Sequence, residues 1–395
     1  MPDPIQPFDL RKIALAAFGP SLLFGIGEGA IFPILALSAT DLGASPAWSG
    51  FIVSLIGIGS LVSNLPAAIL TSRFGERLAM MGAALFCLCA LVLCLIAHHP
   101  WVLAVGVFMI GMSTSVFMLA RQTYLIEAVP ISMRARALST LGGTMRIGMF
   151  SGPFIGAAFI HFLGLSGAYW AAMVAVLGAG VLASTLPDMD ARSGEPRAAA
   201  PRIAMTGLMA AHVRVFLTLG VATALVSALR ACRQIVIPLW AEQIGLDATT
   251  TAIVYGIMGG IDMMLFYPAG KIMDLRGRLW IAVPSMLIMG ASLMAIPFTD
   301  GLMLFLIASM VLGMGNGIGS GLIMTVGADA SPPKGRTEFL GLWRFIADLG
   351  TGGGPLLLSG VTALLSLATG IATIGMLGFV AAAMFWQWLP RRTPS

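Results

Sequence analysis

Residues 78–97 read LAMMGAALFCLCALVLCLIA, a run of twenty residues without a charged side chain. A helix needs about 20 mainly apolar residues to cross the hydrocarbon core of a bilayer, so this run is long enough to span a membrane. The same character extends along the chain, because 58% of its 395 residues are hydrophobic and only 10% are charged. A soluble domain carries about a quarter charged residues. The sequence therefore predicts an all-α protein that is surrounded mostly by lipid.

Apolar runs between polar breaks predict twelve transmembrane helices. They cover residues 13–38, 47–71, 78–97, 101–128, 136–163, 167–186, 213–239, 250–272, 279–298, 301–329, 337–362 and 366–388. The segment 187–212 is rich in Pro, Arg, Ala and Ser, and is therefore predicted to be a cytoplasmic linker. We expect a six-helix bundle over residues 1–186 and a second one over residues 213–395.

Basic residues are distributed unevenly between the predicted loops. If the N-terminus is cytoplasmic and the chain changes side at each span, all 22 Lys and Arg residues fall in cytoplasmic segments or inside spans. The outer loops then carry acidic charges, namely Asp41, Glu242, Asp247 and Asp300. Cytoplasmic loops of membrane proteins are enriched in Lys and Arg, so both termini are predicted to be cytoplasmic. The same placement explains the net charge of +5, and no basic stripe predicts a nucleic-acid partner.

The second half of the chain repeats the first at a shift of 202 residues. The landmarks that coincide are Pro66 with Pro268, Gly75 with Gly277, Pro130 with Pro332, Arg134 with Arg336, and Gly148, Gly152 and Pro153 with Gly350, Gly354 and Pro355. Around the first helix a small offset is needed, where residues 31–33 match residues 236–238. Parallel repeats of this kind are typical of secondary transporters.

One nine-residue segment identifies a family that the chain resembles. Residues 270–278 read GKIMDLRGR, and they match the loop signature G-x-x-x-D-x-x-G-[RK] of the major facilitator superfamily, with Asp274 as the acid and Arg278 as its last residue. The first copy, around Arg73, has Ser72 where the acid belongs. The resemblance covers essentially the whole chain. It implies alternating access between two halves, with Arg73, Asp274 and Arg278 holding the cytoplasmic side closed.

A second segment resembles the drug–proton antiporters of that superfamily. Residues 148–156 read GMFSGPFIG, similar to their G-x-x-x-G-P-x-x-G element in the fifth helix. The repeat mate at 350–355 shows that helix packing alone would also explain the motif. The arginine that these antiporters carry early in the fourth helix has no counterpart in residues 107–111, although Arg121 follows later in that helix.

Ionisable residues inside the predicted spans are the candidates for function, because a charge in the membrane is costly unless it is paired or hydrated. Glu28, Arg230 and Arg233 lie towards the outer side, and the acid is expected to face the two arginines across the central cavity. Glu28 is then either a proton-exchanging group or part of an outer gate of static ion pairs. Asp348 is a second candidate for proton exchange.

The other membrane charges are expected closer to the cytoplasm. Arg146 and Asp262 lie at similar depths, so they are predicted to form a bridge between the two halves. Arg344 and Asp348 are four residues apart and are expected to pair on one helix. Arg121 is expected to bind substrate or to pair with Glu127.

Two uncharged polar residues complete the set of cavity candidates, Asn64 in the second span and Asn316 in the Gly-rich run of the tenth. The 26 methionines suit an adaptable apolar pocket, although such residues also face lipid or the protein core. The cysteines lie within apolar runs, so no disulfide is predicted. The sequence also lacks the residue spacing typical of metal ligands, so no metal site is predicted.

Three functions remain open at this point. The first is proton-coupled efflux of small amphipathic organic compounds, by a monomer in the inner cell membrane that needs no cofactor. The second is import or exchange of an organic anion, favoured by five arginines against three acids within the spans. The third is a sensor that transports nothing. An enzyme is not expected, because the sequence contains no catalytic constellation, metal-ligand spacing or phosphate-binding loop.

Overall fold

The fold is described from a computed structural model, for residues 10–129, 134–187, 205–332 and 335–390. These residues form helices and connecting turns, without a β-strand among them. The elements are α1 (Leu10–Asp41), α2 (Pro46–Leu95), α3 (Pro100–Ala128), α4 (Arg134–Leu163), α5 (Ser166–Ser184), α6 (Met205–Ala211), α7 (Val213–Val215), η2 (Phe216–Gly220), α8 (Val221–Gln243), α9 (Ala248–Arg276), α10 (Leu279–Ala295), η3 (Ile296–Phe298), α11 (Leu302–Ile318), α12 (Leu322–Ala330), α13 (Arg336–Leu364) and α14 (Leu367–Trp388).

The chain divides into two compact units. Unit 1 consists of Met1–Ile31 and Ile58–Pro196, and unit 2 consists of Phe32–Gly57 and Arg197–Ser395. The division at residue 196 falls within the predicted linker, most of which lies outside the described residues. The end of α1 and the start of α2 group with unit 2, which sequence analysis did not anticipate.

The prediction of a twelve-helix membrane fold is confirmed. Within the described residues, ten helices are long and apolar enough to cross a bilayer. One of them, α2, has 50 residues and is interrupted at Gly75 (φ 77°, ψ 162°), so it accounts for two of the predicted spans. The repeat mate Gly277 has nearly the same backbone angles (φ 95°, ψ 164°) and ends α9. Both positions need glycine because L side chains rarely adopt positive φ.

The remaining predicted span is α13, which carries four charged residues and is not among those ten helices. The predicted span 301–329 differs in another way, because it is not one continuous helix. It breaks after α11, where Gly321 has a φ of 82°, and it resumes as α12. Interrupted helices occur in transporters where the backbone lines a site, because polar partners nearby satisfy the freed groups.

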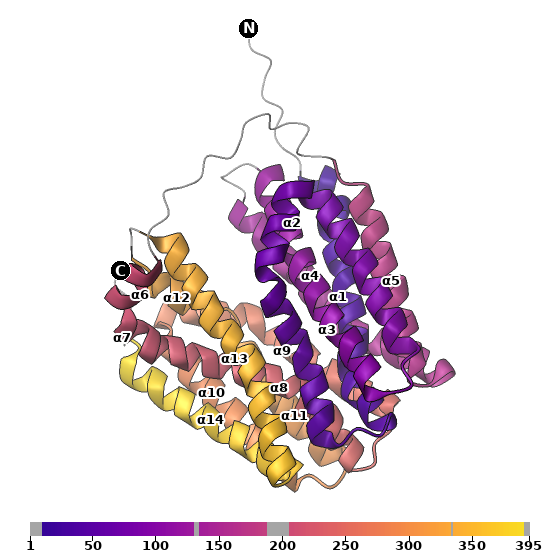
Figure 1. Cartoon of the computed structure of the whole chain (residues 1–395). Coiled ribbons are helices and arrows are strands. Elements are labelled where there is room, and N and C mark those ends of the chain that lie inside the picture. Colours follow the sequence, from indigo (N-terminus) through magenta and orange to yellow (C-terminus); the bar gives the residue numbers. More distant parts are fainter. Residues whose placement is uncertain (1–9, 130–133, 188–204, 333–334, 391–395) are drawn as a thin grey trace. The chain divides into compact units, whose positions relative to one another are not determined.

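The Gly-Pro element serves the same packing role in both repeats. In unit 1, α4 lies against α1 (Figure 1), and a Cβ added at Gly152 would meet the Cα of Gly29 at 2.7 Å. In unit 2, α13 lies against α8, and a Cβ added at Gly354 would meet the Cα of Ala228 at 2.7 Å. Small residues allow helices to approach this closely in membranes. Helix packing therefore accounts for both copies of the motif.

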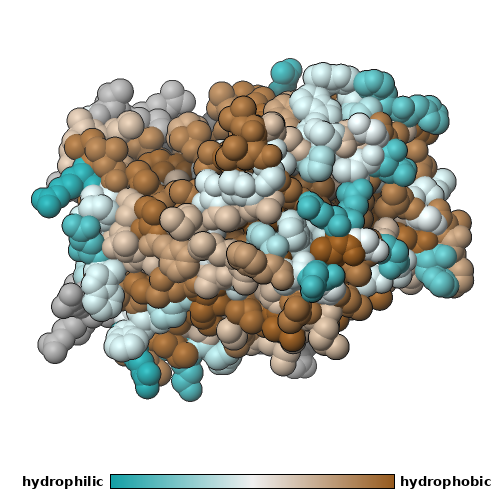
Figure 2. Space-filling view, turned by 90° about the horizontal axis from the view of Figure 1, so that it is seen from below, coloured by the Kyte–Doolittle hydropathy of each residue, from teal (hydrophilic) through white to brown (hydrophobic). Residues whose placement is uncertain are grey.

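Large hydrophobic side chains cover much of the outside of the protein. Figure 2 shows them over most of the face that it presents. Examples on the two units are Leu65 (72% exposed) and Phe162 (81%) in unit 1, and Met264 (75%) and Leu364 (84%) in unit 2. A soluble monomer rarely exposes such extended apolar surface. Such an apolar exterior fits a protein that crosses the membrane several times.

Candidate functional site

Within the described residues, each unit contains a cluster in which polar side chains from different helices surround a buried acid. The cluster of unit 1, called here the Glu28 cluster, consists of Glu28 from α1 with Thr114 and Arg121 from α3. Glu28 is only 6% exposed, and its Oε1 accepts a hydrogen bond of 2.7 Å from the Thr114 hydroxyl. The acid is therefore buried in a span and held by a single neutral donor.

Arg121 supplies the positive charge of the Glu28 cluster. It lies seven residues after Thr114, hence on the same face of α3, and it interacts electrostatically with Glu28. Its Nε and Nη1 are buried and have no hydrogen-bond partner among the described residues. Arg121 thus faces the charge of Glu28, and its predicted pairing with Glu127 stays a prediction.

The surroundings of the Glu28 cluster fix α1 against α3. Phe24 and Phe117 stack with ring centroids 4.1 Å apart, one helical turn from Glu28 and from Thr114 respectively. Beside Thr114, the Ser115 hydroxyl donates a 2.7 Å hydrogen bond to Oδ1 of Asn64 on α2. The predicted cavity residue Asn64 therefore contacts the helix that carries Thr114 and Arg121.

An apolar cavity of about 520 Å³ opens on the other side of the same helix turn. Met112, Ser113 and Val116 of α3 line it together with Phe74 and Phe86 of α2. Its size falls within the range of roughly 300–1,000 Å³ that small-molecule sites occupy. Unit 1 thus places an apolar cavity and a buried acid on neighbouring faces of α3.

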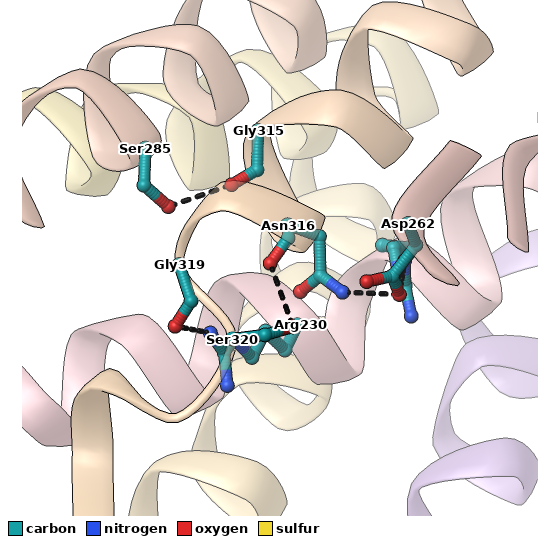
Figure 3. Close-up of polar contacts among 8 residues, drawn as sticks. Arg230, Asp262, Ser285, Gly315, Asn316, Gly319 and Ser320 are labelled. Carbon is teal, nitrogen blue, oxygen red and sulfur yellow. Dashed lines mark hydrogen bonds and ion pairs between the residues drawn. The ribbon is translucent and has the colours of Figure 1, made fainter. Parts of the chain in front are cut away.

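The cluster of unit 2, called here the Asp262 cluster, has a different design. Oδ2 of Asp262 on α9 accepts from Nη1 of Arg233 on α8 at 3.2 Å and from Nδ2 of Asn316 on α11 at 2.6 Å. Figure 3 shows Asn316 pointing towards Asp262. The side chains of Arg233 and Asp262 are each only 13% exposed. This acid is therefore held by a direct, largely buried ion pair and by an amide donor.

Arg230 binds the end of a helix beside the Asp262 cluster. Its Nη2 donates a 2.6 Å hydrogen bond to the carbonyl of Gly319, the residue that follows the last residue of α11 (Figure 3). The last carbonyls of a helix lack intrahelical partners and carry partial negative charge, so a cation stabilises them. Arg230 thus caps α11 at the break before α12. Its predicted role in substrate binding stays a prediction.

Glycines of α11 let this helix approach its neighbours closely. A Cβ at Gly317 would meet the Cα of Asp262 at 2.9 Å, and one at Gly315 would meet the backbone nitrogen of Met289 at 3.0 Å. The Gly315 carbonyl also accepts a 2.7 Å hydrogen bond from Ser285 on α10 (Figure 3). The Gly-rich run therefore brings Asn316 within reach of Asp262.

The signature segment forms a further contact within unit 2. Arg278 makes an ion pair with Asp329 of α12, with Nε 2.8 Å from Oδ2, and its Nη1 donates to the Met273 carbonyl. This contact joins the turn between α9 and α10 to α12. The side chain of Asp274 lies outside the described residues. In the first copy, the Arg73 guanidinium lies 5.6 Å from the centre of the Phe74 ring.

Several ion pairs that the sequence predicts are not tested by these contacts. The Glu28–Arg233 and Arg146–Asp262 contacts would join the two units, and they stay predictions, although Oδ2 of Asp262 already binds two groups of its own unit. Arg344 is exposed, and its pairing with Asp348 likewise stays a prediction, as does proton exchange at Asp348.

Sequence analysis missed three residues that the structure places in these contacts, namely Thr114, Ser115 and Asp329. One signal for Thr114 was available, because the repeat shift of 202 residues places it opposite Asn316. Both repeat mates donate a hydrogen bond to an acid. Hydroxyl residues are otherwise common in membrane helices, so a lone Thr or Ser gives little warning.

Comparisons with known proteins define the class of protein. A family model of the Major Facilitator Superfamily matches residues 18–355 and 268–395. The chain therefore belongs to the major facilitator superfamily and is a transporter of that family. The structure is similar to the crystal structure of a D-xylose–proton symporter, with a TM-score of 0.74 at 16% identity, covering 97% of this chain and 98% of that one.

Two relatives differ in how much of the chain they match. The multidrug resistance protein MdtH of Enterobacter sp. (strain 638) is 23% identical over 399 residues, which covers 95% of this chain and 94% of that protein. The probable inositol transporter 3 of Arabidopsis thaliana is 31% identical over 156 residues. That match covers 38% of this chain and only 27% of the inositol transporter.

Proposed function

We propose that the protein exports small amphipathic organic compounds in exchange for protons, and that Glu28 carries the proton. The observation that supports this most is the Glu28 cluster, in which a buried membrane acid has one hydroxyl donor and one positive neighbour. Ionisable residues inside transmembrane helices mark proton relays and substrate paths in pumps and transporters. On this proposal the protein lies in the inner cell membrane with both termini in the cytoplasm.

The partners of Glu28 suit a group that gains and loses a proton. A hydroxyl both donates and accepts hydrogen bonds, so Thr114 can donate to the ionised carboxylate and accept from the protonated acid after rotation. Arg121 stabilises the ionised form alone. Protonation of Glu28 would therefore weaken its attraction to α3 while the hydrogen bond to Thr114 persists, and such a change biases the conformations of a transporter.

The proposed substrate class rests on the apolar cavity of unit 1 and on the relatives. The cavity walls are mainly Pro, Leu, Phe, Ala and Met side chains, which accept the apolar part of a ligand. MdtH, which the chain matches over nearly its whole length, is named a multidrug resistance protein. At 23% identity this similarity supports the substrate class as a proposal.

Flux in proteoliposomes under an imposed pH gradient tests the proposal. Wild type and Glu28→Gln are compared with cationic, neutral and anionic compounds, and Glu242→Gln serves as the control because Glu242 is exposed. We expect cationic or neutral amphipaths to move against the proton gradient in wild type and in the control, with coupling lost in Glu28→Gln. Movement of anions alone, or coupling that survives Glu28→Gln, would favour the organic-anion alternative instead.

A further inference from the structure

A groove of about 800 Å³ runs along the outside of unit 2 between α10 and α14, two helices that pack side by side (Figure 1). Its lining residues are Val283 and Leu287 of α10 with Phe379, Ala382, Ala383, Trp386, Gln387 and Leu389 of α14 and its C-cap. Trp386 is 57% exposed and Leu287 is 41% exposed. Both helices are long and apolar enough to cross a bilayer. The groove is therefore open to a ligand that comes from the lipid.

Two features of the sequence produce this groove. Towards the middle of the two helices, glycines bring the backbones into contact, because a Cβ added at Gly378 would meet the Cα of Gly290 at 2.8 Å. Small residues allow such close approach between membrane helices. Nearer the end of α14, Ala382 and Ala383 present only methyl groups to the groove. The helices thus touch at the glycines and leave a groove beside the alanines.

The length of the groove matches one leaflet of a bilayer. From Phe379 to Leu389 the helix extends over about 15 Å, at about 1.5 Å per residue. The hydrocarbon core is about 30 Å thick, so the groove has the depth of about one leaflet. Its walls are Val, Leu, Phe and Ala side chains, with Trp386 and Gln387 near its end. This depth and this lining fit one acyl chain of a phospholipid.

The end of the groove lies on the basic side of unit 2. Leu389 also lines a cavity of about 370 Å³ that contains Arg278 and Asp329, and these two side chains neutralise each other in their 2.8 Å ion pair. The other charged side chains described within two turns of the helix ends on this side are the exposed Arg214, Lys271, Arg276 and Arg336 and the partly exposed Glu338. Among these residues the positive charges outnumber the negative ones, so this end of unit 2 attracts an anion.

We propose that this groove binds an anionic phospholipid, with one acyl chain between α10 and α14 and the phosphate beside Leu389. Tryptophans are enriched at the level of the lipid head groups, and Trp386 lies at the end of its membrane helix. The amide of Gln387 can donate a hydrogen bond to an ester or phosphate oxygen of the lipid. Basic pockets between transmembrane helices bind anionic head groups. The lipid is a bound partner rather than the transported compound, so this inference goes beyond the proposed function and does not depend on it.

Quenching of tryptophan fluorescence by brominated lipids tests the proposal on the purified full chain in detergent. Phosphatidylglycerol, which is anionic, is compared with zwitterionic phosphatidylcholine, and both carry bromine on one acyl chain. The signal of Trp386 is the difference between wild type and Trp386→Phe. We expect phosphatidylglycerol to quench this signal at an about fivefold lower lipid concentration, because one charge contributes about that factor near a basic surface. The preference should shrink in about 1 M salt, which screens the charges.

A variant that fills the groove locates the binding. Ala383→Phe places a large side chain among the lining residues, so the quenching of Trp386 should lose its preference for phosphatidylglycerol. Ala291→Phe is the matched control, because Ala291 is an exposed alanine of α10 outside the lining. Equal quenching by the two lipids in wild type, or a preference that survives Ala383→Phe, would overturn the proposal. If that variant does not fold, the comparison of the two lipids on wild type still decides the question.

A second copy of the chain is the other occupant that would fit an apolar groove between membrane helices. Analytical ultracentrifugation of wild type and Ala383→Phe in lipid-free detergent distinguishes the two occupants. The proposal expects the same oligomeric state for both proteins. A wild-type dimer that Ala383→Phe dissociates would overturn the proposal in favour of a contact between two copies.

Discussion

The Glu28 cluster and the Asp262 cluster solve the same problem, a buried acid in a membrane helix, in two different ways. In both, a repeat mate donates a hydrogen bond to the acid, Thr114 in unit 1 and Asn316 in unit 2. The cations differ. Arg233 contacts Asp262 directly, whereas Arg121 reaches Glu28 only by longer-range electrostatics.

Under the proposed function, the difference favours Glu28 as the acid that exchanges a proton. Asp262 and Arg233 form a largely buried pair, and removing one member of such a pair is strongly destabilising. Glu28 has a hydroxyl partner that can bond to either protonation state. The repeat thus keeps the donor position and varies the charges around it. The residue opposite Glu28 in the repeat is Arg233, so the sign of the charge is reversed at that position.

The largest expected effect on stability comes from removing the cation of the Asp262 cluster. Arg233→Leu leaves Asp262 charged and buried, which should lower the free energy of unfolding by about 3–5 kcal/mol. The measurement is SDS-induced unfolding in mixed micelles. Adding Asp262→Asn to the same chain should restore part of the loss, because no buried charge then remains.

Arg121→Leu is the matched change in unit 1. Arg121→Leu should lower the free energy of unfolding by less than Arg233→Leu does, because Glu28 retains its hydrogen bond from Thr114. If the two variants lower the free energy of unfolding equally, the direct pairing of Asp262 and the looser pairing of Glu28 do not differ in their effect on stability.

The next effect concerns the helix packing that both repeats share. Gly354→Ala should cost about 1–3 kcal/mol, because its Cβ would overlap the backbone of Ala228. Gly353→Ala is the control, since a Cβ there meets nothing within 4 Å. Gly152→Ala with Gly143→Ala repeats the comparison in unit 1. A similar cost at Gly353 and Gly354 would contradict the role of close approach, because helix propensity favours Ala over Gly at both positions.

Removing the hydroxyl donor of the Glu28 cluster tests how much a single hydrogen bond contributes to the stability of that cluster. Thr114→Val should reduce the free energy of unfolding by about 1–2 kcal/mol, because Glu28 loses its donor. Thr144→Val is the control, since that hydroxyl binds only the carbonyl of Leu141 in its own helix. Thermal unfolding in detergent should show a larger loss of stability for Thr114→Val than for Thr144→Val. A larger loss for Thr144→Val would contradict the role of Thr114 as the donor to Glu28.

The smallest effect is expected at the start of α9, the helix that carries Asp262. Asp247 caps this helix, and hydrogen bonds from the hydroxyl and the backbone N–H of Thr250 and from the N–H of Thr249 lower its pKa. Asp247→Ala should cost about 1 kcal/mol at neutral pH. A lowered pKa contributes stability above the unfolded value of about 3.9, and this contribution is lost as pH falls further through the folded pKa.

The pH dependence of that variant provides its own check. The difference in unfolding free energy between wild type and Asp247→Ala should narrow as the pH falls below about 4. Asp300→Ala, which removes another exposed acid, is the comparison variant. A constant difference across the acidic range would show that the carboxylate charge does not contribute to the cap.

Much of the fold was predictable because lipid imposes a simple pattern on the sequence. Apolar length gave the spans, and the coincidence of Pro66 with Pro268 and of Gly75 with Gly277 gave the repeat. The partners of the buried charges were less predictable. Counting along a helix gives the depth of Asp262, but it does not say which neighbour that face meets. The close approach at Gly317, which places Asn316 beside Asp262, becomes visible only in the packed structure.

The central claim is that Glu28 exchanges a proton, whereas Asp262 serves in its ion pair with Arg233. Infrared difference spectroscopy of the reconstituted protein between acidic and alkaline pH tests it most directly, because protonated carboxyl groups absorb in a separate band. We predict that the titrating carboxyl absorption of wild type and of Asp262→Asn contains one component that is absent in Glu28→Gln. A band that persists in Glu28→Gln and disappears in Asp262→Asn would contradict the account.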